Sequence, residues 1–116
     1  MPSTTINDQT INLIEKNIHV NNIRLTYFEH GIANRGLGPT LLFVHATGFH
    51  ARVWDKIIRQ FSNHHIITID QRGHGRSEKK LITHWDEVVT DLTELITSLN
   101  LTNIIGIGHS MGAHAL

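Results

Sequence analysis

Several features are scarce or missing in this 116-residue chain, and each absence excludes a class of function. There is no cysteine, which excludes disulfides and thiolate chemistry. Ten basic and ten acidic residues cancel, so the chain lacks the electrostatic field that attracts nucleic acid or an anionic membrane. We therefore expect neither nucleic acid nor a membrane as a partner.

Long apolar runs are missing as well. No run approaches the roughly 18 residues that a membrane span needs. The N-terminus has neither the basic nor the apolar region of a signal peptide. A cytoplasmic location is the resulting default. The composition, 40% hydrophobic and 17% charged, is typical of one globular domain.

Histidine, by contrast, is abundant, with ten copies. A metal site needs histidines that converge from one face, as in His-x-x-x-His on a helix. The close pairs do not have this spacing; they are His45/His50, His64/His65 and His109/His114. We expect no metal and no other cofactor.

The pattern of apolar residues predicts a hairpin followed by alternating strands and helices. Segments 17–20 and 23–30 flank Asn21-Asn22, and asparagine tolerates the positive φ of a tight turn. Apolar runs at 41–44, 66–69 and 104–107 predict buried strands. The alternation indicates an α/β fold with a mostly parallel sheet of about five strands. We assign residues 1–16 to an N-terminal extension and 17–116 to the domain.

Two helices are expected between these strands. A short amphipathic helix is predicted around 53–61. A longer one follows from the stripe at period 3.6 that runs from Trp85 to Leu99. Thr83 and Asp86 resemble a capping box at its start, and Asn100 is a plausible stop.

The strongest chemical signal is Gly108-His109-Ser110-Met111-Gly112, where the last predicted strand ends. A Gly-x-Ser-x-Gly turn between a strand and a helix presents a serine as a nucleophile. The glycines permit the strained, crowded backbone that such a turn needs. The Met111 amide, at the start of the next helix, would point at an oxyanion. The alternative is a glycine-rich turn with an incidental serine.

Two further loops are predicted at the same edge of the sheet. The loop 45–50 (His-Ala-Thr-Gly-Phe-His) follows a buried strand and can supply a second oxyanion N–H, from Thr47. We interpret His45 as an imidazole that braces this loop. The loop 70–77 (Asp-Gln-Arg-Gly-His-Gly-Arg-Ser) lacks the lysine and the following helix of a Walker-type phosphate loop. We expect it to be structural.

In this order and at this spacing, the three loops resemble those of the α/β-hydrolase fold superfamily, from Asn17 to Leu116. The resemblance implies a sheet of order 1-2-4-3-5-6-7-8, of which this chain would supply the first five strands. It implies that Ser110 is the nucleophile, that the Thr47 and Met111 amides form the oxyanion hole, and that Gly108 and Gly112 are the elbow glycines. Ala46 departs from the pattern, since glycine more often follows the histidine there.

By this resemblance the protein is a serine hydrolase of small acyl substrates (ester, thioester, lactone or amide) that acts through an acyl-enzyme on Ser110. A serine at the elbow, instead of an aspartate, argues against dehalogenase or epoxide hydrolase chemistry. The substrate and the oligomeric state are left open.

The catalytic acid and base are missing from the chain. In the superfamily the acid and then the histidine follow the serine, but here only His114 follows, four residues on in the same predicted helix. We therefore expect an N-terminal fragment truncated after the elbow and inactive by itself. One alternative is an inactive or non-enzymatic hydrolase-fold fragment. Another, a Rossmann-like nucleotide binder, lacks its Gly-x-Gly-x-x-Gly motif.

Overall fold

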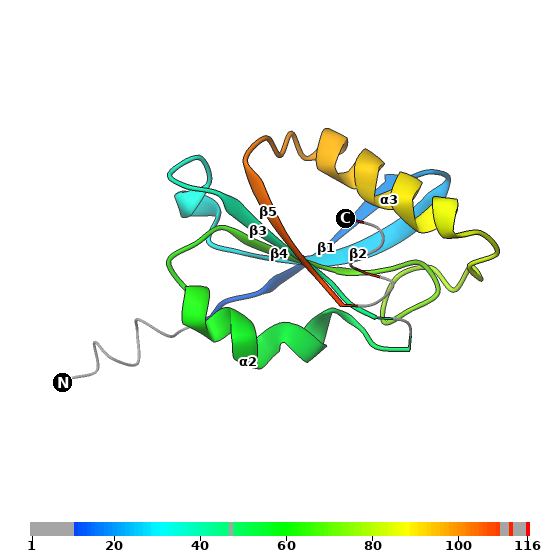
Figure 1. Ribbon diagram of the computed structural model, residues 1–116, viewed down its shortest axis with the longest axis horizontal. Coiled ribbons are helices and arrows are strands. Elements are labelled where there is room, and N and C mark those ends of the chain that lie inside the picture. Colours follow the sequence, from blue (N-terminus) through cyan, green and yellow to red (C-terminus); the bar gives the residue numbers. More distant parts are fainter. Residues whose placement is uncertain (1–10, 47, 110–111, 113–115) are drawn as a thin grey trace.

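The computed structural model describes residues 11–46, 48–109, 112 and 116. Five strands form one sheet in the order β1-β2-β4-β3-β5 (Figure 1). Their bounds are Ile14–Val20 (β1), Ile23–His30 (β2), Thr40–Val44 (β3), Ile66–Asp70 (β4) and Ile104–Gly108 (β5). β1, β2 and β4 pair antiparallel, whereas β4, β3 and β5 run parallel. The predicted fold class and the order of the first five strands are confirmed.

The hairpin forms at the predicted turn. Asn21 and Asn22 adopt φ values of 48° and 63°, which asparagine tolerates better than most residues. Strand β1 begins at Ile14, inside the segment assigned to the N-terminal extension. A short 3-10 turn, η1 (Ile32–Asn34), follows β2.

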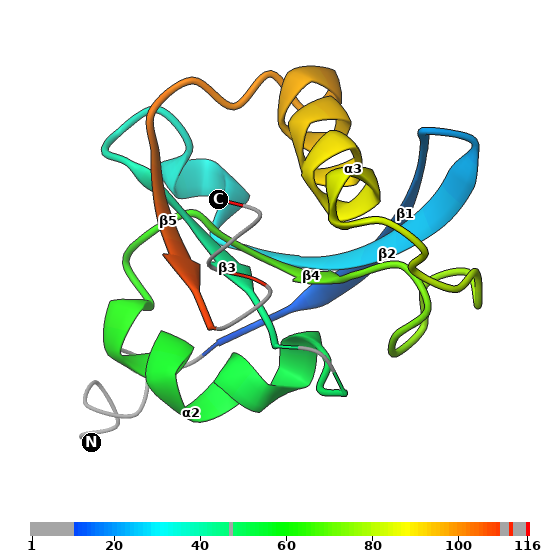
Figure 2. The ribbon, with the colours of Figure 1, turned by 45° about the vertical axis from the view of Figure 1, so that its right-hand side comes forward.

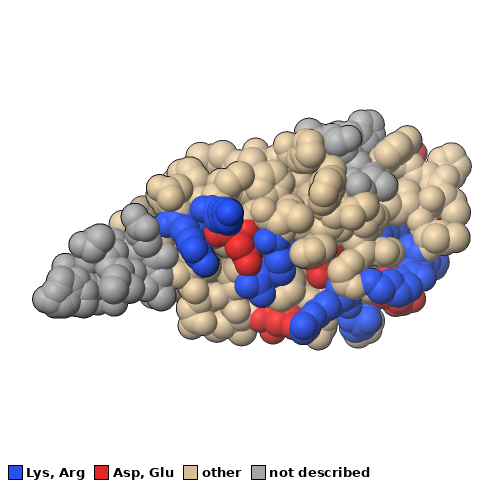
Figure 3. Space-filling model, turned by 90° about the horizontal axis from the view of Figure 1, so that it is seen from below, with Lys and Arg blue, Asp and Glu red and all other residues tan. Residues whose placement is uncertain are grey.

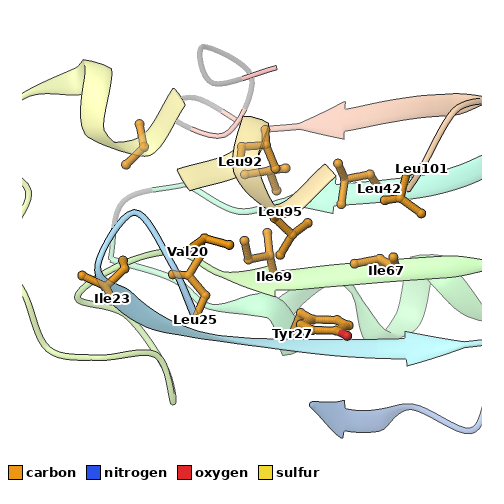
Figure 4. Close-up of a cluster of buried hydrophobic side chains, with 12 residues drawn as sticks. Val20, Ile23, Leu25, Tyr27, Leu42, Ile67, Ile69, Leu92, Leu95 and Leu101 are labelled. Carbon is orange, nitrogen blue, oxygen red and sulfur yellow. The ribbon is translucent and has the colours of Figure 1, made fainter. Parts of the chain in front are cut away.

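The longer helix, α3 (Trp85–Ser98), covers one face of the sheet (Figures 1 and 2). Its Leu92 and Leu95 side chains join a core cluster with strand residues such as Ile69, drawn in Figure 4. Trp85, the first residue of the predicted stripe, is 55% exposed. The burial of the stripe therefore begins one turn later, at Val88.

The ends of α3 are set by local hydrogen bonds. Asn100 lies just beyond the helix with φ 55°, as predicted for a stop. The predicted capping pair is wrong by one residue: Glu87, not Asp86, accepts the backbone N–H groups of Thr83 and His84 at 2.7 and 3.0 Å. The reason is that the helix starts at Trp85, which makes Glu87 its third residue. These bonds lower the pKa of Glu87 to about 2.

The opposite face of the sheet is covered by three short helical turns instead of one regular helix. They are η2 (Ala51–Trp54), α2 (Asp55–Ile58) and η3 (Arg59–Phe61). Trp54 packs against Phe43, with ring centroids 5.2 Å apart, and Ile58 is fully buried. Val53 and Ile57 are about half exposed, so only part of the predicted apolar stripe enters this core.

Strand β5 forms one edge of the described sheet. It was expected to be buried, but Ile105 is 50% exposed. No described strand pairs with the outer side of β5. Figure 3 shows Lys and Arg beside Asp and Glu on the face seen from below, in keeping with the balanced charge. In the part of the chain that is described, no helix is long and apolar enough to cross a membrane.

Candidate active site

The carboxyl ends of three parallel strands bring the three predicted loops to one edge of the sheet. In the register, Val44 of β3 lies opposite Gly108 of β5 and Ile69 of β4. The His109 N–H donates to the Val44 carbonyl at 3.1 Å, one residue beyond the end of β5. The chain therefore leaves the three strands at nearly the same level, where open α/β sheets bind their ligands.

The elbow segment packs directly on the end of β3. Gly108 ends β5, and the Gly112 N–H donates to the His109 carbonyl at 3.0 Å. A Cβ atom added to Gly112 would lie 2.0 Å from the Val44 carbonyl oxygen, so this position accepts only glycine without a shift of the backbone. The predicted nucleophile Ser110 and the amide of Met111 lie outside the described residues.

The loop after β3 reaches toward the elbow. Gly48 has φ +87°, a conformation that favours glycine, and the Phe49 N–H donates to the Ala46 carbonyl at 3.1 Å. The Phe49 ring is half exposed and its centroid lies 6.2 Å from that of His109. This contact joins the loop to the elbow. Thr47, the predicted second oxyanion donor, lies outside the described residues.

His45 is completely buried at the start of this loop. Its Nδ1 lies 2.7 Å from the Ala46 carbonyl oxygen, and its Nε2 accepts the Gln71 N–H at 2.9 Å. An acceptor at Nε2 requires a neutral ring with its proton on Nδ1. Burial lowers the pKa of His45, which favours the same neutral form. The imidazole braces this loop, as predicted, and also holds the start of the loop after β4. It is not placed as a base.

The loop after β4 is a framework of buried polar contacts. The Asp70 carboxylate accepts the backbone N–H groups of Ala51 and Arg76 at 2.7 and 2.9 Å. The Gln71 side chain donates to the His45 carbonyl at 2.7 Å. Gly75 has φ +51°, and its Cβ, if present, would collide with the Asp70 carboxylate. The loop is structural, as predicted, and ties the loop after β3 in place.

Arg72 connects the same loop to helix α3. Its guanidinium forms a bidentate pair with Asp91, with N–O distances of 2.7 and 2.8 Å, and both side chains are buried. A second carboxylate, Glu87, lies 3.3 Å away, and Asn21 also donates to Asp91, at 3.0 Å. The hydrogen bonds to Asp91 raise the pKa of Arg72, which keeps the guanidinium charged.

His74 was not predicted to act on the site, yet its ring contacts the loop after β3. The Gly48 N–H donates to His74 Nε2 at 3.0 Å, and His74 Nδ1 lies 2.9 Å from the Arg72 carbonyl oxygen. The feature of the sequence that could have indicated this contact is the position of His74 between Gly73 and Gly75, in a loop at this edge of the sheet. Among the described residues, no three His, Asp or Glu side chains are arranged to hold a metal ion.

Comparisons with known proteins agree with this geometry. Residues 41–116 match the model of the alpha/beta hydrolase family. An (E)-2-((N-methylformamido)methylene)succinate hydrolase of Acinetobacter baylyi is 35% identical over 104 residues, which cover 87% of this chain and 38% of that protein. A 2-(acetamidomethylene)succinate hydrolase of Mesorhizobium japonicum is 32% identical over 84 residues, covering 71% of this chain and 30% of that protein.

Solved structures share the fold over nearly the same range. The crystal structure of an epoxide hydrolase from Vigna radiata superposes with a TM-score of 0.78 at 25% identity, and covers 89% of this chain and 34% of that one. The chain therefore spans about a third of the length of the relatives that it matches. With the family model, the strand order and the three loops in agreement, the chain belongs to the alpha/beta hydrolase family.

Proposed function

We propose that these residues form the nucleophile-bearing part of a serine hydrolase that acts on a small acyl substrate. The observation that carries the proposal is the seat of Gly112 against the Val44 carbonyl, where a side chain would collide. Gly112 is the last glycine of the Gly-x-Ser-x-Gly motif. A glycine at this position of a nucleophile elbow lets the turn lie close to the backbone of the neighbouring strand.

In the proposed reaction the Ser110 hydroxyl attacks the acyl carbon and its proton passes to a histidine base. The negative charge moves onto the acyl oxygen, which accepts hydrogen bonds from the backbone N–H groups of Thr47 and Met111. The leaving group departs with the proton, and water then releases the acid from Ser110. Only His114 follows Ser110 in this sequence and no acidic residue does, so we assign neither the base nor its carboxylate to a residue of this chain.

Two relatives bear on the class of substrate. Both are named as hydrolases of methylenesuccinates that carry an amide group, N-methylformamido in one and acetamido in the other. An amide lies within the range expected for a serine nucleophile, beside esters, thioesters and lactones. We propose an acylated small molecule of this kind as the substrate.

The test is a chimeric protein in which this chain replaces the aligned part of the Acinetobacter baylyi hydrolase, exposed to a fluorophosphonate probe. We expect covalent labelling that is lost in Ser110→Ala and kept in Ser98→Ala, a matched change at an exposed serine. Circular dichroism shows whether each chimera is folded. Equal labelling of Ser110→Ala, or no labelling of a folded chimera, would overturn the proposal and favour a non-enzymatic hydrolase-fold protein.

A further inference from the structure

We propose that His74 is a positioning residue for the oxyanion loop, which we define as the described residues 45–46 and 48–50 after β3. In its neutral form the imidazole holds the Gly48 N–H, next in the chain to Thr47, and protonation of the ring releases it. The inference rests on the proposed function, because it assigns the loop's geometry a role in stabilising the oxyanion.

The hydrogen bonds of the ring define its protonation state. Nε2 lies 3.0 Å from the Gly48 nitrogen, whose single proton it must accept, so Nε2 carries none. Nδ1 lies 2.9 Å from the Arg72 carbonyl oxygen and must therefore carry the proton. His74 is a neutral Nδ1–H tautomer, the same form as His45, whose ring centroid is 5.0 Å away.

The bond from His74 holds the middle of the loop, whereas other groups hold its ends. Gln71 binds the His45 carbonyl at one end, and Asp70 accepts the Ala51 N–H just beyond the other. Gly48 has no side chain and a positive φ, and an added Cβ there would meet no other atom within 4 Å. The space beside Gly48 is open, and the His74 ring supplies a hydrogen bond to its N–H.

Protonation would place an N–H at Nε2 opposite the N–H of Gly48, which converts an attraction into a repulsion. The His45 ring lies 5.0 Å from the His74 ring, and the charges of Asp70 and His50 also act on His45. The Arg72 guanidinium has only donors and cannot accept the Gly48 N–H, and the Asp70 carboxylate already accepts two backbone N–H groups. An oxyanion hole requires its donors within a few tenths of an ångström. Release of Gly48 should therefore lower kcat much more than it changes KM.

The first test is nuclear magnetic resonance on the 15N-labelled chain. At neutral pH we expect the His74 ring to show the proton on Nδ1. On acidification, the Gly48 amide should shift together with the His74 ring resonances. In His74→Gln, whose side-chain oxygen can accept the bond without titrating, that shift should vanish. It should persist in His30→Leu, a control whose ring instead binds the Ser62 carbonyl at 2.8 Å. A proton on Nε2 at neutral pH, or a Gly48 titration that survives in His74→Gln, overturns the inference.

The second test uses the chimeric hydrolase. We expect His74→Leu to lower kcat about tenfold with KM changed less than about twofold, and His74→Gln to restore most of the rate. An unchanged kcat in a folded His74→Leu chimera also overturns the inference. These outcomes differ from failure of the proposed function, which appears as labelling independent of Ser110 and does not alter the Gly48 resonance.

Discussion

At the scale of single residues, the elbow depends on a glycine that touches backbone. We predict that Gly112→Ala abolishes serine-dependent fluorophosphonate labelling of the chimera and destabilises it by about 1–3 kcal/mol. The new Cβ would lie 2.0 Å from the Val44 carbonyl oxygen, which cannot move without disturbing the pairing of β3. Gly38→Ala is the matched control, because its Cβ would meet no other atom within 4 Å. Similar labelling and melting temperatures for the two variants would contradict the prediction.

Residues that a local backbone conformation requires could be predicted from the sequence. The residues that they contact in the folded chain could not. The positive φ at Asn21, Asn22 and Asn100 follows from what asparagine tolerates locally. The bracing role of His45 followed from its place at the end of a strand. That Gly112 meets Val44, and that His74 meets Gly48, depends on which strands become neighbours and in what register. Strand order and register cannot be derived from the local sequence pattern at these residues.

At the scale of elements, the buried pair of Arg72 and Asp91 fastens helix α3 to the loop after β4. We predict that Arg72→Met lowers the free energy of unfolding by about 3–5 kcal/mol, because Asp91 would be left in a buried site without its partner. The more exposed pair of Arg52 and Asp55 provides the control, and Arg52→Met should cost no more than about 1 kcal/mol. Urea unfolding of the chain measures both. Equal losses for the two variants would show that burial does not set the difference.

The elements themselves were largely predictable, within limits that have physical causes. The bounds of α3 follow from its apolar period, and its capping pair was missed by one residue because Thr83 and His84 both precede the helix. Asp91, which lies among the buried residues of α3, was not predicted to pair with Arg72. The two are 19 residues apart and meet only after the loop and the helix pack together. The region 51–61 forms three short turns in which Ala51, Trp54 and Ile58 are buried, while Val53 and Ile57 are about half exposed.

At the scale of the whole molecule, the outer side of β5 pairs with no described strand. The backbone bonds to β3 involve Asn103 and His109, so by strand alternation the even-numbered residues between them direct their N–H and C=O groups outward. The sequence carries no Lys, Arg, Asp or Glu from residue 95 to 116. Strand β5 therefore has no charged side chain of its own to oppose pairing with another strand. We expect copies of the 116-residue chain to associate through β5.

The expected association is concentration-dependent and visible by analytical ultracentrifugation. Ile105→Lys should shift the chain toward monomer at the same concentration, because a lysine on an edge strand opposes pairing with another strand. Ile105 is 50% exposed, so the substitution need not disturb the core. Leu81→Lys, at a side chain that is 81% exposed in the segment before α3, removes a hydrophobic group of similar size away from the edge and should leave the association unchanged. If Leu81→Lys disperses the chain as well as Ile105→Lys does, general hydrophobic exposure drives the association instead of the open hydrogen bonds of β5.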